Sequence, residues 1–267
     1  MPHPPPQSAH TYGDSVLGHQ LPNELRRLRL IEQVLDPDSV MLLRECQIQP
    51  SWHCLELGAG AGSIAYWLAR QCPSGQVSAV DLDTRFLDPN SFANLAVHAH
   101  DVLDCDFPAE SFNLIHTRAL LVHVPRREEL LRKAVEWLAP GGWLVAEEPV
   151  VIGDGDSPYP AFRALISAMK TLLARHGADL LWPRRMPIVA RANGLTDLSV
   201  STRTLPCGQG GAGDRLWRAM FEQLGPALIS HGLLSQTQWQ EGIGLFDDPS
   251  FVEISLTMLT TRACRSA

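Results

Sequence analysis

The stretch that decides the fold reads His53-Cys54-Leu55-Glu56-Leu57-Gly58-Ala59-Gly60-Ala61-Gly62-Ser63-Ile64-Ala65. A short apolar run holds Glu56 near its end, three glycines follow at alternate positions, and a helix-like segment begins at Ser63. We interpret this order as strand, tight turn and helix. Glycine lets the turn adopt positive φ and lets a ligand approach the backbone closely. The helix N-terminus behind the turn offers unpaired N–H groups and a positive dipole end.

The glycine spacing and the acid before it narrow the kind of ligand. The fingerprint of dinucleotide-binding turns is G-x-G-x-x-G, whereas here the glycines follow G-x-G-x-G and Ser63 takes the third fingerprint position. A carboxylate at Glu56 would repel a pyrophosphate and attract a ligand that carries an ammonium group. The alternative is a glycine-rich turn that binds no ligand, because a glycine pattern alone is a weak signal.

This stretch resembles the E/D-x-G-x-G-x-G motif of class I S-adenosylmethionine-dependent methyltransferases. S-adenosylmethionine carries an ammonium group and a sulfonium and no phosphate, and the resemblance makes it the expected cofactor. Two further segments strengthen the likeness to the ubiquinone/menaquinone-methyltransferase-like group of actinobacterial natural-product type: Leu138 to Glu148, which fits L-x-P-G-G-x-L-x-x-x-E, and Asp81 to Leu87. The resemblance covers residues 52–150 and implies cofactor contacts from Glu56, Gly58, Ala59 and Gly60.

Acids also follow the next two predicted strands. The strand over 76–80 ends at Asp81-Leu82-Asp83, and Asp81 lies about twenty residues past the glycine turn, as expected of a carboxylate that binds ribose hydroxyls. The resembled family uses the acid at this strand end in that way, while Asp83 could instead cap a following helix. The resemblance implies that Asp101, after a strand over 96–100, meets the adenine amino group. Further cofactor contacts are expected from Leu82, Val102, His116 and Thr117.

The alternation of strand and helix patterns predicts an α/β fold with a doubly wound sheet, and the resemblance implies seven strands, mostly parallel. More strands are predicted over 112–116 and 143–148, with a helix over 127–138 between them. Apolar and polar residues alternate from Phe251 to Thr261. This period of two predicts a last strand with one face less buried, as in an antiparallel pairing at a sheet edge. In the resembled family, such a strand separates the fold from the dinucleotide-binding fold.

The chain divides into five expected parts. Residues 1–11 are expected to be a disordered tail. Residues 12–50 form an N-terminal helical lid, predicted as two helices broken at Asp36-Pro37-Asp38-Ser39, which either closes over the ligand or only packs against the core. Residues 51–150 form the Rossmann-like cofactor-binding core. An insertion over 151–192, with a helix over 161–176, is the expected substrate cap. Residues 193–267, with a helix over 214–224, complete the core.

Few residues offer acid–base chemistry near the expected cleft. His123 is the expected catalytic base, because it lies seven residues past the predicted strand end at His116 and imidazole titrates in the right range. The alternative for both histidines is a packed structural role. Contacts to the acceptor substrate are expected from Tyr12, Arg118, Glu148 and Trp182. The alternatives are a salt bridge to a neighbouring helix for Arg118, structural pairing for Glu148, and core or lid packing for Tyr12 and Trp182.

Composition limits the partners. The 267-residue chain is 45% hydrophobic and carries a net charge of −7, which argues against a nucleic-acid partner or an anionic membrane surface. Six cysteines without C-x-x-C spacing predict neither a metal site nor a disulfide framework. No apolar run has the length of a membrane span, and no signal-peptide core is seen, so a cytoplasmic enzyme is expected, with a homodimer possible.

The expected function is transfer of a methyl group from S-adenosylmethionine to an O, N or C atom of a small molecule, a secondary metabolite by resemblance. One alternative keeps the cofactor but catalyses a cyclisation or rearrangement, and product mass separates the two. Another alternative is a non-catalytic partner subunit of the same fold. The acids Glu56, Asp81 and Asp101 argue against it, and cofactor binding tests it.

Overall fold

The computed structural model describes residues 16–151, 154–208 and 210–266. The tail expected over 1–11 and the proposed substrate contact Tyr12 lie outside these residues. Seven strands form a single sheet in the order β3-β2-β1-β4-β5-β7-β6. The strands are β1 (His53–Leu57), β2 (Gln76–Asp81), β3 (Leu95–Ala99), β4 (Phe112–Arg118), β5 (Leu138–Val150), β6 (Leu195–Gly208) and β7 (Val252–Arg265).

The direction of the strands confirms the predicted fold class. Strands β1 to β5 pair in parallel, and β7 runs antiparallel to both β5 and β6. The order reverses between β1 and β4, which are neighbours although two strands separate them in the chain. Crevices at such a reversal, beyond the carboxyl ends of the strands, are where open α/β sheets bind ligands.

The position of β7 corrects one expectation. Its alternating pattern predicted an edge strand with one open face, but β7 lies between β5 and β6, and residues 257–261 are buried on both faces. Strand β6 pairs with β7 on the side away from β5 and forms the edge of the sheet instead. No strand was predicted over 195–208, because most side chains of β6 are polar or exposed and show no apolar alternation.

Helices cover both faces of this sheet. The described residues form helices α1 (Glu24–Arg44), α2 (Ser63–Gln71), α3 (Arg127–Trp137), α4 (Pro160–Arg175), α5 (Met186–Ala192), α6 (Ala212–Ser230) and α7 (Gln236–Gly244), with 3-10 turns η2 (Leu121–His123), η3 (Asp154–Asp156), η4 (Trp182–Arg185) and η5 (Leu245–Asp247). Helices α3 and α5 bury apolar side chains against one face, and α2 and the end of α1 against the other.

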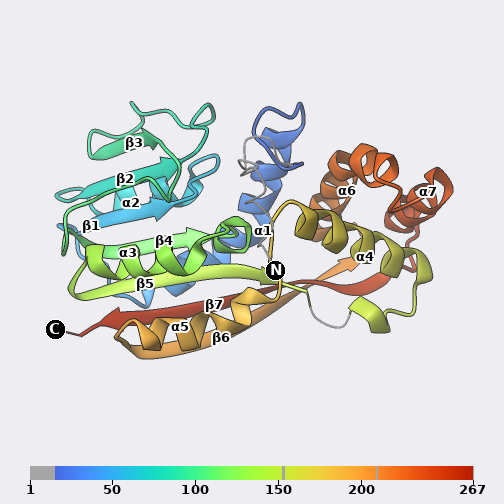
Figure 1. The fold of residues 1–267 in the computed structure, drawn as a ribbon. Helices are drawn as coiled ribbons and strands as arrows, with labels where there is room; N and C mark the ends of the chain where they lie inside the picture. The colour runs from blue at the N-terminus through green and yellow to red at the C-terminus, as the bar shows by residue number, and fades with distance from the viewer. Residues whose placement is uncertain (1–15, 152–153, 209, 267) are drawn as a thin grey trace, which may run out of the picture.

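A helical unit, whose helix α6 also packs against α1, β6 and β7, lies beyond the carboxyl ends of β1, β2 and β4. Figure 1 shows α4, α6 and α7 gathered there, past the arrowheads of these strands. The three helices share one apolar core that includes Phe162, Trp217 and Phe221, and Leu17 from the N-terminal segment packs into it. This unit therefore takes helices from both sides of the boundary expected at 192, while α5 belongs to the main core.

Helix α1 is continuous, although two helices were predicted. Pro37 lies inside it and removes one backbone donor, which normally ends or bends a helix. The polar residues beside the proline are used in tertiary contacts rather than in a turn. Arg118 of β4 donates to Ser39 Oγ at 2.8 Å and pairs with Asp36 Oδ1 at 2.9 Å. These contacts hold both halves of α1 against the sheet and help to offset the missing hydrogen bond.

Candidate active site

The glycine turn between β1 and α2 has the predicted left-handed backbone. Gly58, Gly60 and Gly62 have φ of 73°, 57° and 91°. The amides of Gly58 and Ala59 donate to the carbonyl of Val80 at 2.9 and 3.1 Å, which ties the turn to β2. A Cβ added at Gly62 would lie 2.7 Å from Leu87 and 2.8 Å from the Tyr66 ring, so a side chain cannot fit there without displacing its neighbours.

Asp81, at the end of β2, faces this turn. Its Oδ2 accepts from the Gly60 amide at 2.8 Å, and its Oδ1 accepts from the Asp83 amide at 3.1 Å. The side chain is mostly buried, and burial raises the pKa of its carboxyl, while nearby His19 and the two amides act in the opposite direction. Since a carboxylate offers about four lone-pair sites, Asp81 keeps acceptor capacity for a ligand with two hydroxyls.

Asp101 lies at the same edge of the sheet as Asp81. The amide of His100 donates to the Asp81 carbonyl at 3.0 Å, which holds the ends of β2 and β3 together. The half-buried Asp101 accepts from the Leu103 amide at 2.9 Å in a tight turn. The neighbouring side chains differ in exposure, since Leu82 is half-buried and Val102 packs into the main core. The structure thus brings together the acids expected for ribose and adenine.

The acid that precedes the glycines belongs to a buried network. Glu56 Oε2 lies 2.7 Å from His116 Nδ1, and His116 Nε2 lies 2.8 Å from Glu147 Oε1. All three side chains are at most 4% exposed. His116 was expected to lie beside the cofactor, but both of its ring nitrogens are used by carboxylates. Its role in the structure is the alternative one, a satisfied core histidine.

Charge explains why this network is stable when buried. Burial opposes protonation of His116, but Glu56 and Glu147 outweigh it and raise the pKa of the imidazole to about 9. Burial raises the pKa of Glu56, although His116 and Arg118 lower it. For Glu147 burial is outweighed by His116 and Arg118, and its pKa is lowered. The pairing agrees with the rule that buried charges occur together with opposite charges.

Glu148 has a structural role that excludes its predicted contact with the substrate. Its Oε1 accepts from the Leu121 amide at 2.9 Å, and its Oε2 accepts from the Val122 amide at 3.2 Å. The carboxylate therefore caps the start of turn η2, which carries His123. Both oxygens are used by the backbone and the side chain is 1% exposed, so the expected contact with substrate is wrong.

His123 ends turn η2 and is half-buried. Burial and the nearby guanidinium groups of Arg27 and Arg127 lower the pKa of its imidazole to about 4. At neutral pH the ring is therefore uncharged and can accept a hydrogen bond or a proton. Its low basicity makes it a weaker base than a histidine with an ordinary pKa.

Two other predicted substrate contacts are used elsewhere. Arg118 is held by α1, as the salt-bridge alternative predicted. The Trp182 indole is 3% exposed in the main core, donates to Glu128 Oε1 at 3.4 Å and lies under the Arg127 guanidinium. Trp182 was expected to flank an aromatic acceptor, but its indole packs against α3 in the core, which is the alternative role. Thr117 is buried, and its hydroxyl has no hydrogen-bond partner among the described residues.

Three residues at the site were not predicted. A Cβ added at Gly58 would lie 3.1 Å from the Leu120 side chain, and one at Gly60 would lie 3.5 Å from Leu28 of α1. His19 lies 3.8 Å from Asp81. Leu120 could have been predicted at the site, because it lies just past the carboxyl end of β4. Leu28 and His19 are far from the glycine motif in sequence, and only the tertiary fold brings them to it.

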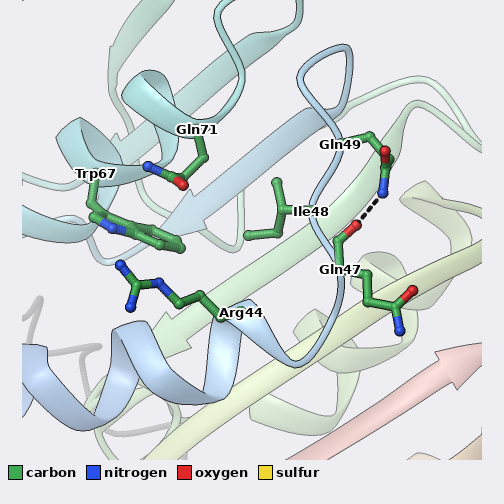
Figure 2. Close-up of a pocket in the computed structure, with 6 residues that line it drawn as sticks. All are labelled: Arg44, Gln47, Ile48, Gln49, Trp67 and Gln71. Atoms are coloured by element: carbon green, nitrogen blue, oxygen red, sulfur yellow. Dashed lines mark hydrogen bonds between the residues drawn. The ribbon is translucent and has the colours of Figure 1, made fainter.

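A surface hollow lies at the opposite end of the parallel strands from Asp81. It is lined by Arg44, Gln47, Ile48, Gln49, Trp67 and Gln71, near the amino end of β1, as Figure 2 shows. It is thus distant from the carboxyl edge that carries Asp81. Within the described ranges, no group of three or more His, Cys, Asp or Glu residues could hold a metal ion. None of the helices in this part of the chain is long and apolar enough to cross a membrane.

Comparisons with known proteins agree with this geometry. Residues 54–142 match a family model described as a methyltransferase domain. Methyltransferase str3 of Strobilurus tenacellus is 28% identical over 156 residues, which cover 57% of this chain and 56% of that protein. Methyltransferase str2 of the same organism is 28% identical over 203 residues, which cover 70% of this chain and 72% of that protein. The chain thus aligns with little more than half of the first relative.

Solved structures share the fold. Phosphoethanolamine N-methyltransferase 2 of Haemonchus contortus, in complex with phosphomonomethylethanolamine and S-adenosylhomocysteine, matches with a TM-score of 0.60. The sequences are 16% identical, and the match covers 92% of this chain and 58% of that one. The two proteins therefore share the fold that carries Asp81 and the glycine turn in this chain. The phosphomonomethylethanolamine of that complex is a ligand of the Haemonchus contortus protein.

Proposed function

We propose that this chain, which carries a class I S-adenosylmethionine-dependent methyltransferase domain, transfers the methyl group of that cofactor to an O, N or C atom of a small molecule. The observation that carries the proposal is the hydrogen bond between Asp81 and the Gly60 amide. It fixes a carboxylate beside a glycine turn at the reversal point of the sheet, where a nucleoside with two hydroxyls would be held.

The residues at this edge fit the cofactor. S-adenosylmethionine supplies an electrophilic methyl group on a sulfonium when it is bound. Gly58 and Gly60 would let it approach the backbone, since a side chain at Gly58 would contact Leu120 at 3.1 Å. Asp81 would accept from its ribose hydroxyls and Asp101 from its adenine amino group. Glu56, buried beneath the turn and paired with His116, would attract its ammonium group through space.

His123 would act on the acceptor substrate. Methyl transfer from a sulfonium needs little covalent help, so the enzyme mainly positions the acceptor and receives its proton. The neutral imidazole of His123 can accept a hydrogen bond from the O–H or N–H group of the acceptor, and it can take that proton once the incoming methyl group has made the acceptor atom positively charged. Glu148 would act as a positioning residue, because it holds the two amides that precede His123 in the turn.

The helical unit of α4, α6 and α7 would cover the acceptor. It lies beyond the carboxyl ends of the parallel strands and has an apolar core of its own. A small apolar or aromatic metabolite fits such a cap better than a polyanion, given the net charge of −7. We propose a secondary metabolite as the acceptor, no nucleic-acid partner, a cytoplasmic enzyme, and a homodimer as one possible assembly.

A panel of acceptors tests this proposal. Purified protein is incubated with S-adenosylmethionine and, in turn, phenols, amines and polyketide-like carbon acids, and the products are read by mass spectrometry. We expect at least one acceptor to gain one CH₂ while S-adenosylhomocysteine accumulates. A product of unchanged mass would instead indicate a cyclisation or rearrangement. No bound S-adenosylmethionine and no product across the panel would contradict the proposal.

A further inference from the structure

The N-terminal segment from Val16 to Asn23 crosses the carboxylate proposed to bind ribose. We call residues 16–23 the strap. Its residue His19 is 7% exposed, and its Nδ1 lies 2.7 Å from the carbonyl oxygen of Asp83. Since a carbonyl can only accept, the hydrogen on this nitrogen is donated by His19. The ring also packs near Phe86, with centroids 5.4 Å apart. The imidazole is thus fixed from two sides.

His19 lies where a ligand of Asp81 would touch it. Its Nδ1 is 3.8 Å from Asp81 Oδ1, too far for a direct hydrogen bond. The Oδ1 already accepts from the Asp83 amide but keeps a second lone pair. A hydroxyl bound at that lone pair would come into contact with the imidazole. Because Asp81 itself is 7% exposed, such a ligand can enter only when the groups around the carboxylate separate.

The strap is anchored at both ends. Leu17, two residues before His19, is 4% exposed in the apolar core of α4, α6 and α7. At the other end the Glu24 amide donates to the Leu21 carbonyl at 3.1 Å, where α1 begins. Glu24 is fully buried, pairs with Arg27 at 2.6 Å and accepts from Gln223 of α6 at 2.8 Å. The strap therefore connects the acceptor cap to the carboxylate of the cofactor site.

We propose that the strap closes over the bound nucleoside and that His19 is the residue that holds it closed. The inference rests on the proposed function, since the nucleoside is that of the cofactor. His19 acts by donating to the Asp83 carbonyl, which places its ring against a ribose held by Asp81. Because Leu17 packs into the cap, this closure depends on the cap. Release of the nucleoside product then requires Leu17 to leave the cap and His19 to leave the Asp83 carbonyl.

Dissociation of S-adenosylhomocysteine measures this closure. Affinity is determined by calorimetry and the dissociation rate by stopped-flow displacement, for wild type and for His19→Ala, His19→Asn and Gln20→Ala. Asn can still donate to the Asp83 carbonyl, and Gln20 is an exposed neighbour on the strap. We expect His19→Ala to weaken affinity roughly three- to tenfold, the effect of one lost hydrogen bond, with most of the change in the dissociation rate. The Asn and Gln20 variants should stay within about twofold of wild type.

Leu17→Ala tests the connection to the cap. With His19 intact, this variant should also speed dissociation of S-adenosylhomocysteine, and melting of the ligand-free proteins separates this effect from unfolding. The inference is overturned if His19→Ala releases the ligand at the wild-type rate, or if His19→Asn is as fast as His19→Ala. It is also overturned if His19→Ala binds more tightly, since the strap would then exclude the nucleoside. Wild-type protein that binds no S-adenosylhomocysteine would contradict the proposed function itself.

Discussion

The backbone amide of Gly60 donates a hydrogen bond to Oδ2 of Asp81 at 2.8 Å. This contact joins the glycine turn after β1 to the last residue of β2. The carboxylate is thereby oriented by the protein before any ligand arrives, which reduces the ordering that binding must impose. A second amide, from Asp83, fixes the other oxygen.

Asp81→Ala should weaken binding of S-adenosylmethionine by about 1.5–3 kcal/mol, the cost of removing a charged hydrogen-bond acceptor. The matched variant is Asp83→Ala, because the Asp83 carboxylate pairs with Arg85 at the surface and its carbonyl is kept. Calorimetric titration compares the two. A larger loss for Asp83→Ala than for Asp81→Ala would show that the ribose carboxylate is wrongly assigned.

Two alanine substitutions in the turn should have different effects. Gly62→Ala places a Cβ 2.7 Å from Leu87 at a φ of 91°, so it should destabilise the fold by about 1–3 kcal/mol. Gly60→Ala has room, with Leu28 at 3.5 Å, so its φ of 57° should cost it stability through backbone strain alone, less than Gly62→Ala loses, and it should also weaken cofactor binding. Urea unfolding and calorimetry on both variants test this. Equal losses of stability would argue against the packing described around Gly62.

His116→Gln should destabilise the protein by about 3 kcal/mol, because it removes the imidazolium that lies between two buried carboxylates. The pKa of His116 is raised from 6.5 to about 9, so its stabilising contribution is complete below about pH 6.5 and is lost as the pH rises through 9. Wild type should therefore lose stability between pH 7 and 9.5 in urea unfolding, as pH passes this pKa. The His116→Gln variant should show a much smaller alkaline loss.

The control for that prediction is His231→Gln, at an exposed histidine after α6. It should unfold like wild type at both pH values. If wild type and His116→Gln lost the same stability on going to high pH, the imidazole would not be the titrating group, and the charged form of the network would be wrong.

Glu148→Gln should lower turnover while leaving cofactor affinity unchanged. Glu148 Oε1 accepts from the Leu120 and Leu121 amides and its Oε2 from the Val122 amide, so the NH₂ group of a glutamine would face at least one of these donors. The turn that carries His123 would then lose at least one of the three hydrogen bonds that Glu148 accepts. Turnover and calorimetry are compared with those of Glu129→Gln, whose side chain pairs with Arg126 at the surface. A loss of cofactor affinity equal to the loss of turnover would place Glu148 in the cofactor site instead.

His123→Ala should lower turnover by about 10²-fold, the lower end of the range for a general base, because the pKa of His123 is low. The neutral ring is the active form, and its pKa is about 4, so turnover by wild type should be flat across neutral pH and fall only in acid. Turnover within about threefold of wild type would remove His123 from the reaction, since a working base contributes far more.

The local motifs could be predicted from the sequence, whereas the tertiary contacts of individual side chains could not. The glycine turn and Asp81 are close in sequence and follow from backbone geometry. Pro37 predicted a helix break, but contacts of its neighbours with Arg118, far along the chain, keep α1 continuous. Trp182 was expected at the substrate because of its residue type, and Glu148 because it ends a predicted strand. Their burial depends on packing that no local pattern records.

Strand β6, at the edge of the sheet, also could not be predicted from local sequence patterns. Strand β6 pairs over its whole length with β7, yet its own sequence is mostly polar because both of its faces are largely exposed. A strand that buries little shows no apolar alternation, so pattern reasoning fails there for a physical reason. The strap is a further example, since His19 reaches Asp81 across 62 positions only when α1 has packed.

Transfer of a labelled methyl group tests the central claim most directly. Enzyme and S-adenosylmethionine with a deuterated methyl group are mixed with the best acceptor of the panel in a single turnover, and product and S-adenosylhomocysteine are measured together. We predict that one deuterated methyl group appears in the product for each S-adenosylhomocysteine formed, and that Asp81→Ala slows both equally at low cofactor concentration. A converted acceptor that carries no label, with S-adenosylmethionine left intact, would contradict methyl transfer.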